Sequence, residues 1–195
     1  MRIFGVILAG GQGLRMGADK AFSLLGRRPL IAHVLDRLKP QVERVLISAN
    51  GDPARFASFG CTVVPDATPQ GPLSGILAAM IHATASGATH LASTPVDTPF
   101  LPGDLVLHLR LAAETSPTGL ALARTPDGDH PTTALWPVTL APALAAFLAE
   151  GGAKVTSFTD AHHATRADFT DARAFLNLNT PQDLAAAEPL LKALQ

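Results

Sequence analysis

An uncharged apolar run, Ile3 to Ala9, opens the chain and leads directly into a glycine-rich stretch. A run of this length without a charged residue predicts a strand buried on both faces, which is typical of a parallel sheet covered by helices. The stretch that follows contains Gly10, Gly11, Gly13 and Gly17. Glycines accept positive φ and let a ligand approach the main chain, so successive N–H groups can converge on an anion. The chain thus begins with a strand and a loop suited to binding phosphate.

Two basic residues, Arg15 and Lys20, follow the first glycines and are placed to complete a phosphate site. The dinucleotide pattern G-x-G-x-x-G fails, because Met16 stands where its third glycine is required, and the P-loop pattern has no match here. The stretch from Leu8 to Lys20 instead resembles L-A-G-G-x-x-x-R-M-G-x-x-K, a signature of nucleotidyltransferases that bind a nucleoside triphosphate in the first turn of a Rossmann-like sheet. The plain alternative is a glycine-rich connection with two solvated basic residues, and the number of matched positions favours the functional interpretation.

Strands and helices alternate along the rest of the chain, as the spacing of apolar residues indicates. Strands are expected at 44–48, 62–64, 90–94, 120–124, 133–136 and 166–169, and helices at 29–39, 53–59, 72–86, 102–114, 142–150, from 153 onward and at 181–194. A chain of 195 residues suits one domain of this kind and is short for two. We therefore expect a single α/β domain over residues 1–195. The nucleotidyltransferase resemblance makes it a Rossmann-like three-layer fold with a mostly parallel sheet.

Polar residues follow three of the expected strands at their carboxyl ends, where open α/β sheets bind ligands. They are Asn50, Asp66 and Asp97. An Asx turn is the plain interpretation of Asn50, and simple termination of a strand that of Asp66. Asp97 lies between Pro95 and Pro99, which restrict the backbone around the carboxylate. Because Mg²⁺ needs only one or two protein carboxylates beside substrate phosphates, Asp97 together with the glycine loop predicts a magnesium site.

Further motifs narrow the resemblance to one family. They are Gly71-Pro72-Leu73-Ser74-Gly75, Val96-Asp97-Thr98-Pro99, His130-Pro131-Thr132, Gly152-Ala153-Lys154-Val155 and Asn177-Leu178-Asn179-Thr180-Pro181. Together with the opening motif they resemble the molybdenum cofactor guanylyltransferases, the MobA family, over essentially the whole chain. Members of that family are single α/β domains that join GMP from GTP to the phosphate of molybdopterin, giving the guanine dinucleotide cofactor and pyrophosphate.

The resemblance implies a role for each matching residue of the opening loop. It implies main-chain contacts to GTP at Leu8, Ala9 and Gly10, with Gly11 in the same loop, and a contact from Lys20 to the phosphates. The N-terminal half is therefore expected to bind GTP and Mg²⁺, and the C-terminal half molybdopterin.

The resemblance also assigns the polar residues at the strand ends. It implies that Asn50 and Asp66 bind the nucleoside and that Asp97 binds both nucleotide and Mg²⁺. The pterin side is matched by three short segments: His130 to Thr132, Lys154, and Asn177 to Asn179. Catalysis is expected from Arg15, Lys20 and Asp97, because the molybdopterin phosphate is already a nucleophile and the reaction needs positioning and charge stabilisation.

Composition excludes several classes of protein. A net charge of -1 gives no reason to expect nucleic acid as a partner, and no apolar run approaches the roughly 20 residues that a membrane helix needs. Cys61 is the only cysteine, which excludes an internal disulfide and a cysteine-based metal cluster. We expect a cytoplasmic monomer whose substrates are GTP and molybdopterin, with transient contacts to molybdenum-cofactor biosynthesis proteins or acceptor molybdoenzymes.

Three other activities remain open at this point. A cytidylyltransferase acting on the same pterin would share the opening loop and Asp97. A sugar-phosphate nucleotidyltransferase usually has a longer chain. A nucleotide-binding protein without catalysis would have no need to keep Arg15, Lys20 and Asp97 together.

Overall fold

The computed structural model describes residues 1–10, 19–66, 68 and 70–193. Its main strands are β1 (Ile3–Leu8), β4 (Arg44–Ser48), β5 (Thr62–Val64), β6 (His90–Pro95), β7 (Ala121–Thr125), β8 (Gly128–Pro137) and β9 (Thr165–Asp168). They form one sheet in the order β5-β4-β1-β6-β8-β7-β9. Only β8 pairs antiparallel with its neighbours; β1 pairs parallel with both β4 and β6. The mostly parallel sheet expected from the sequence is confirmed.

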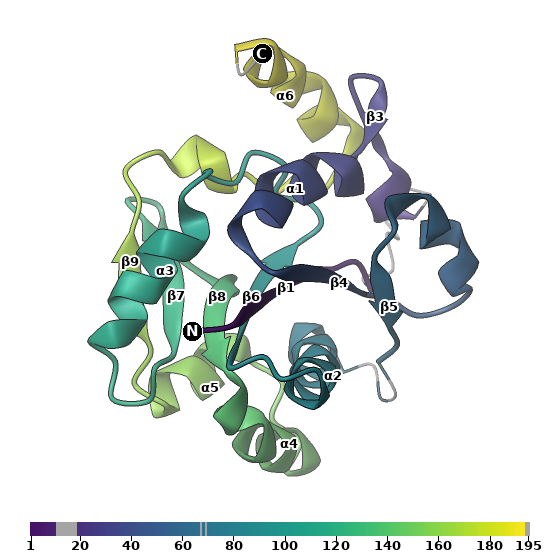
Figure 1. Ribbon diagram of the computed structural model, residues 1–195. Helices are drawn as coiled ribbons and strands as arrows, with labels where there is room; N and C mark the ends of the chain where they lie inside the picture. The colour runs from purple at the N-terminus through teal and green to yellow at the C-terminus, as the bar shows by residue number, and fades with distance from the viewer. Residues whose placement is uncertain (11–18, 67, 69, 194–195) are drawn as a thin grey trace.

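Helices cover both faces of this sheet (Figure 1). They are α1 (Leu30–Leu38), α2 (Pro72–Ala85), α3 (Leu105–Glu114), α4 (Ala141–Ala149), α5 (Val155–Ala161) and α6 (Pro181–Ala193), with 3₁₀ turns at Lys20–Phe22, Lys39–Gln41, Pro53–Phe59, Val138–Leu140 and Ala172–Phe175. Helices α1 and α3 lie on one face, and α2, α4 and α5 on the other (Figure 1). The Rossmann-like three-layer arrangement is therefore confirmed.

The opening strand is apolar throughout because both of its faces are buried. Ile7 packs in the core beneath α1 and α3, whereas Phe4 and Val6 pack in the core beneath α2, and all three are fully buried. Between them Gly5 leaves room for α1, since a Cβ there would lie 2.9 Å from Cδ2 of Leu38. Burial on two sides, with a close helix crossing at the glycine, suits the position of β1 inside the sheet, between β4 and β6.

Strand β8 begins at Gly128, earlier than expected, because it forms a hairpin with β7. The pairing with β7 then jumps from His130 to Ala134, so three residues of β8 have no partner on β7. Pro131 lies in this bulge, where its missing N–H removes no ladder hydrogen bond. Thr132, also in the bulge, lines a cleft at the carboxyl ends of the parallel strands. The irregular register therefore places Thr132 at this cleft.

Helix α3 begins at Leu105, later than the expected start at 102. The amide of Gln41 explains the difference, because its Nε2 donates to the carbonyl of Pro102 at 2.9 Å while its Oε1 accepts from the N–H of Val106 at 2.9 Å. A side chain from a distant turn thus satisfies a first-turn N–H of the helix. Local sequence gives no sign of such a cap.

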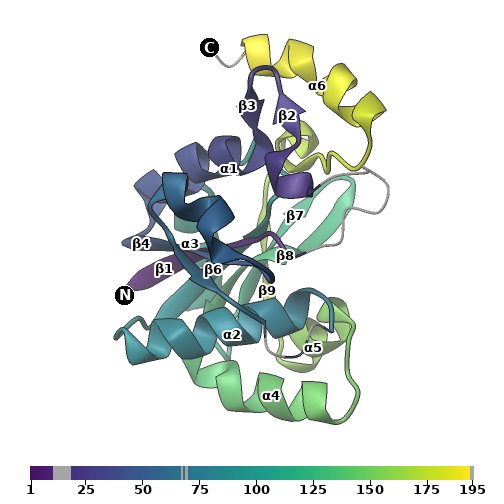
Figure 2. The same cartoon turned by 90° about the vertical axis from the view of Figure 1, so that its right-hand side faces the viewer.

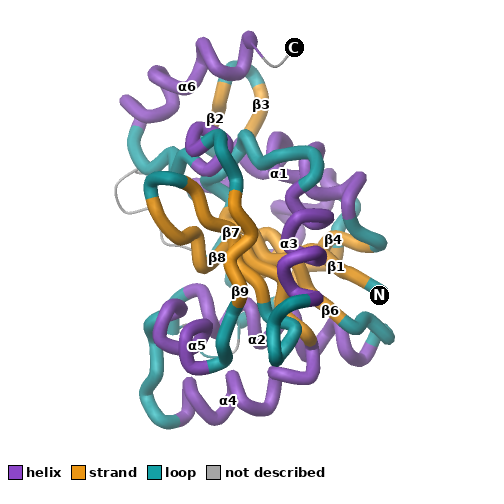
Figure 3. Tube along the Cα trace, turned by 90° about the vertical axis from the view of Figure 1, so that its left-hand side faces the viewer, coloured by secondary structure: helices purple, strands orange, loops and turns teal. Residues whose placement is uncertain are grey.

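A short hairpin and the last helix form a separate apolar cluster. The hairpin consists of β2 (Leu24–Leu25) and β3 (Arg28–Pro29), so α1 begins at Leu30, one residue later than expected. Helix α6 lies beside this hairpin, above the sheet (Figures 2 and 3). Their shared buried residues are Leu25, Leu30, Phe100, Leu178 and Ala187. The N–H of Asp183 donates to Thr180 Oγ1 at 3.1 Å, so Thr180 caps the N-terminus of α6.

Trp136→Phe should lower the free energy of unfolding by about 2 kcal/mol. Trp136 is fully buried, and its indole N–H donates to Ser93 Oγ at 2.8 Å. Phenylalanine would remove that donor and leave space in the core. Urea denaturation measures the change, with Leu107→Ala as the control, because Leu107 is 47% exposed. Equal losses in the two variants would contradict the role given to Trp136.

Candidate active site

A cleft of about 280 Å³ lies at the carboxyl ends of the parallel strands, beside the first turn of α2. Six residues expected to act in the site line it: Leu8, Gly10, Lys20, Asn50, Asp66 and Asp97. Thus the ends of β1, β4 and β6 and the second residue after β5 meet at one place, as parallel strands in an open sheet require. Of the remaining expected residues, Gly11 and Arg15 lie outside the described part of the chain.

The main chain at the end of β1 is held inside the sheet. The N–H of Ala9 donates to the carbonyl of Ser48 at 2.8 Å, and the carbonyl of Leu8 accepts from the N–H of Val96 at 3.1 Å. Ala9 is buried and is not among the residues that line the cleft. Leu8 and Gly10 do line it, so β1 delivers its last residue and the start of the glycine loop to the cleft.

A lysine and a carboxylate meet at one end of the cleft. Lys20 Nζ lies 2.5 Å from Asp97 Oδ2, and the two side chains are 16% and 15% exposed. The same ammonium donates to Asn179 Oδ1 at 2.5 Å. The main-chain carbonyl of Asp97 accepts from the N–H of Leu178 at 2.9 Å. Residues from the first and last parts of the chain therefore share this end of the site.

The other carboxylate oxygen of Asp97 does not take part in the contact with Lys20. Asp97 Oδ1 is buried and has no hydrogen-bond partner among the described residues. A buried carboxylate oxygen without a partner is costly, unless a ligand completes it. Within residues 1–10, 19–66, 68 and 70–193 no cluster of three potential metal-ligating side chains occurs. A single carboxylate is enough for Mg²⁺, which takes one or two protein carboxylates and completes its shell with phosphates and water, so the unpartnered oxygen of Asp97 fits this ion.

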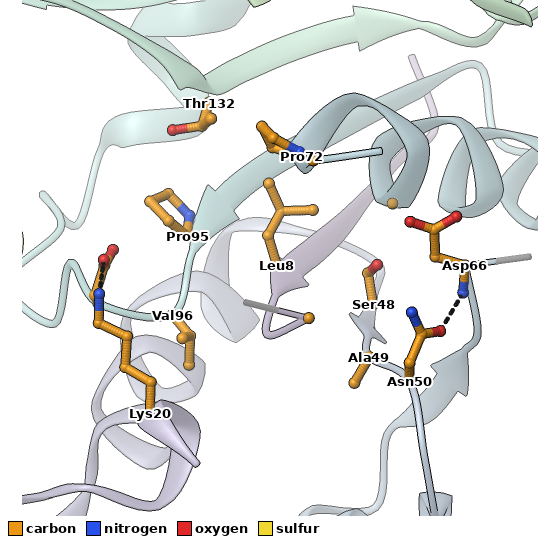
Figure 4. Close-up of a pocket in the computed structure, with 14 residues that line it drawn as sticks. Leu8, Lys20, Ser48, Ala49, Asn50, Asp66, Pro72, Pro95, Val96 and Thr132 are labelled. Atoms are coloured by element: carbon orange, nitrogen blue, oxygen red, sulfur yellow. Dashed lines mark hydrogen bonds and ion pairs between the residues drawn. The ribbon is translucent and has the colours of Figure 1, made fainter. Parts of the chain in front are cut away.

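An amide and a carboxylate occupy the other end of the cleft. Figure 4 shows Asn50 and Asp66 across the cleft from Lys20. The N–H of Asp66 donates to Asn50 Oδ1 at 2.8 Å. The carboxylate of Asp66 accepts from the N–H of Thr68 at 3.0 Å and from the hydroxyl of Ser74. These contacts fix the orientation of the Asp66 carboxylate. The cleft therefore has polar groups at both of its ends.

Helix α2 presents its N-terminus to the space between these ends. Gly71, with φ of 86°, precedes the helix, and Pro72 is its first residue. Gly75 allows the close approach of α2 to the sheet, because a Cβ there would lie 2.5 Å from Ser48 Oγ. Gly71, Pro72 and Gly75 all line the cleft. The positive end of the helix dipole therefore faces a cleft that also holds an ammonium group.

His130, expected on the pterin side, is not among the residues that line the cleft. Its Nε2 is 2.9 Å from Thr125 Oγ1, and its ring stacks on Phe175 with 4.7 Å between centroids. Burial lowers the pKa of His130, while the carboxylates of Asp127 and Asp129 act in the opposite direction. The net effect favours the neutral ring, so His130 is a packing and hydrogen-bonding group in this structure.

The other pterin-side residues differ in how close they come to the cleft. Thr132 lines it, and Asn179 reaches Lys20, whereas Lys154 is exposed at the start of α5 and does not line it. Ser48 also lines the cleft and was not expected to do so from the sequence. One feature of the sequence could have indicated this role: Ser48 lies at the end of an expected strand, directly before the loop that carries Asn50.

Comparison with known proteins identifies the family. A family model described as the MobA-like NTP transferase domain matches residues 5–165. The chain belongs to this family. A molybdenum cofactor guanylyltransferase from Cereibacter sphaeroides is 56% identical to this MobA-like chain over 193 residues, which cover 98% of each protein. A protein of the same name from Rhodobacter capsulatus is 47% identical over 195 residues, again 98% of each.

A solved structure supports the fold of this MobA-like NTP transferase. Molybdopterin-guanine dinucleotide biosynthesis protein A from Archaeoglobus fulgidus superimposes with a TM-score of 0.78 at 22% identity, covering 97% of this chain and 99% of that one. Like its relatives, this MobA-like protein is a nucleotidyltransferase. In the described part of the chain, no helix has the length and apolar character needed to cross a membrane.

Proposed function

We propose that this MobA-like NTP transferase transfers GMP from GTP to the phosphate of molybdopterin, forming the guanine dinucleotide cofactor and releasing pyrophosphate. The observation that carries the proposal is a single cleft with Lys20 and Asp97 at one end and Asn50 and Asp66 at the other. A nucleoside triphosphate has a matching arrangement, with anionic phosphates at one end and a hydrogen-bonding base at the other. The names of relatives that are 56% and 47% identical over nearly the whole chain support the same activity.

The phosphates of GTP belong at the end that carries the ammonium group. Lys20, the positive end of α2 and the main chain at Gly10 face the space where the triphosphate would lie. Charge-assisted hydrogen bonds from such groups are stronger than neutral ones, and they neutralise charge that grows as pyrophosphate departs. Asp97 would hold Mg²⁺ through its unpartnered oxygen. When bound, the metal would supply Lewis-acid stabilisation to the phosphate oxygens.

The acceptor approaches from the side of Asn179 and Thr132. An oxygen of the molybdopterin phosphate forms a bond to the α-phosphorus, the bond from that phosphorus to the bridging oxygen of the β-phosphate breaks, and pyrophosphate leaves with the electron pair. The acceptor oxygen is already anionic, so no side chain has to remove a proton. The chain's own residues contribute by aligning the two phosphates and by holding Lys20 near Asp97 and Asn179.

The base end favours guanine on chemical grounds. The carboxylate of Asp66 can only accept hydrogen bonds when ionised, and its two oxygens lie side by side. On its pairing edge guanine offers two adjacent donors, the ring N1–H and the 2-amino group, whereas cytosine and adenine offer one amino group beside an acceptor nitrogen. Hydrogen bonds from Ser74 and Thr68 keep the orientation of this carboxylate fixed.

Pyrophosphate release, measured with Mg²⁺ and each of GTP, CTP, ATP and UTP, tests the proposal in the presence and absence of molybdopterin. We expect release only when GTP and the pterin are both present. Release with CTP in place of GTP would keep the reaction and reject the base assignment. GTP binding without release from any nucleotide would reject the transfer reaction and favour a binding protein.

A further inference from the structure

Arg55 connects the two ends of the cleft although it does not line the cleft itself. It belongs to the 3₁₀ turn Pro53–Phe59, and its guanidinium group forms an ion pair with Asp19 through Nη1. Through Nη2 the same group donates to the main-chain carbonyl of Asn50 at 2.7 Å. Its Cζ lies 4.7 Å from the ring centre of Phe56, a fully buried residue. The guanidinium group of Arg55, packed on the ring of Phe56, thus contacts two separate loops.

The contact with Asp19 acts on the ammonium end of the cleft. Asp19 is the N-cap of the turn Lys20–Phe22, and its Oδ1 accepts from the N–H of Ala21 at 3.2 Å. Its other oxygen pairs with Arg55. Lys20 is the first residue of the capped turn, so the orientation of Asp19 determines where the lysine side chain starts.

The contact with Asn50 acts on the base end. With its carbonyl bound to Arg55, Asn50 directs its side-chain Oδ1 to the N–H of Asp66. Arg55 therefore holds the main chain of Asn50, and the side chain of Asn50 in turn holds the main chain of Asp66. Removing Arg55 would remove the polar tie between the two loops and leave only the packing of Phe22 on Phe56 and Phe59 between the described turns that flank them.

We propose that Arg55 is a positioning residue for the nucleotide, which fixes the distance between the phosphate-binding and base-binding ends of the cleft. The inference rests on the proposed binding of GTP in that cleft. Its side chain and that of Asp19 are 33% and 26% exposed, and exposed ion pairs of this kind contribute little to stability. The value of the contact therefore lies in preorganisation of the site and not in holding the fold together.

Arg55→Met is the central variant, because methionine keeps an apolar stem against Phe56 and removes both hydrogen bonds. We expect its affinity for GTP, measured by calorimetry, to fall about tenfold, with the same rise in KM for GTP and an unchanged melting temperature. Arg55→Lys should behave similarly, since an ammonium group lacks the planar fork that spans two acceptors. Arg124→Met is the matched control: Arg124 pairs with the exposed Asp168 outside the cleft, and its loss should leave GTP affinity unchanged.

A double variant tests whether Arg55 acts through Asp19. Asp19→Asn retains a side chain able to cap the turn and removes the charge that pairs with Arg55. In the Arg55→Met background this second change should weaken GTP binding much less than it does in the wild type. Fully additive losses would contradict the proposed route.

Two results would overturn the inference while leaving the proposed function intact. One is wild-type GTP affinity in Arg55→Met. The other is a lower kcat and melting temperature with KM for GTP unchanged, which would give Arg55 a merely structural role. Failure of the wild-type protein to bind GTP would instead reject the proposed function, and the inference with it.

Discussion

Asp97→Ala should abolish GTP-dependent pyrophosphate release, with a loss of about a thousandfold or more. The side chain provides a buried oxygen without a partner among the described residues, together with a second oxygen that pairs with Lys20. Alanine removes both, so the Lys20 end of the cleft loses the carboxylate that we propose to hold Mg²⁺ near the triphosphate. Release is measured with saturating GTP, Mg²⁺ and molybdopterin.

The fold of the Asp97→Ala variant should be intact. The contact that anchors this loop to the C-terminal segment runs through the main-chain carbonyl of residue 97, which alanine retains. Asp97→Asn is the matched control, because it keeps the volume and an oxygen for Lys20 but lacks the charge. Both variants should show the circular dichroism and melting temperature of the wild type. Activity close to wild type in Asp97→Ala would remove this residue from the mechanism.

Lys20→Ala should lower GTP affinity by about 10- to 100-fold, the usual range for losing a hydrogen bond to a charged group. The ammonium group is 16% exposed and lies between Asp97 and Asn179. Among the residues that the structure describes, Lys20 is the cation that lines the cleft, so we expect it to contact the phosphates of bound GTP. Calorimetry with GTP measures the loss.

Guanosine provides the control for the lysine variant, because it has the base and sugar but no phosphate. Its affinity should be the same for Lys20→Ala and for the wild type, while GTP affinity differs. Lys20→Arg should recover part of the loss, since it restores the charge with a different shape. Unchanged GTP affinity in Lys20→Ala would contradict a phosphate site at this end of the cleft.

The sequence predicted the parts of this molecule that depend on local pattern. The uncharged run at β1 indicated a strand with two buried faces, and the order of strands and helices indicated the layered sheet. Asn50, Asp66 and Asp97 were found by one rule, that ligands bind where parallel strands end. All three line the cleft, because their strands are parallel neighbours or adjoin one another through β1.

The parts that could not be predicted depend on contacts between distant residues. The contact between Lys20 and Asn179 spans 159 positions, and the cap that Gln41 gives to α3 spans 65. Arg55 looks in the sequence like any exposed arginine, and only the positions of two other loops make it a bridge. Periodicity reports which face of an element is buried, but it carries no information about which side chains meet across the fold.

The link from Leu178 and Asn179 back to Asp97 and Lys20 also sets an order for maturation of the protein during synthesis. The ribosome makes the glycine loop first and Asp97 about midway, so a half-finished chain already contains most of the residues that line the cleft. It lacks the amide that fixes the aspartate loop and the oxygen that steadies the lysine. The centre is therefore complete only after the segment that carries Leu178 and Asn179 has folded back onto Asp97 and Lys20.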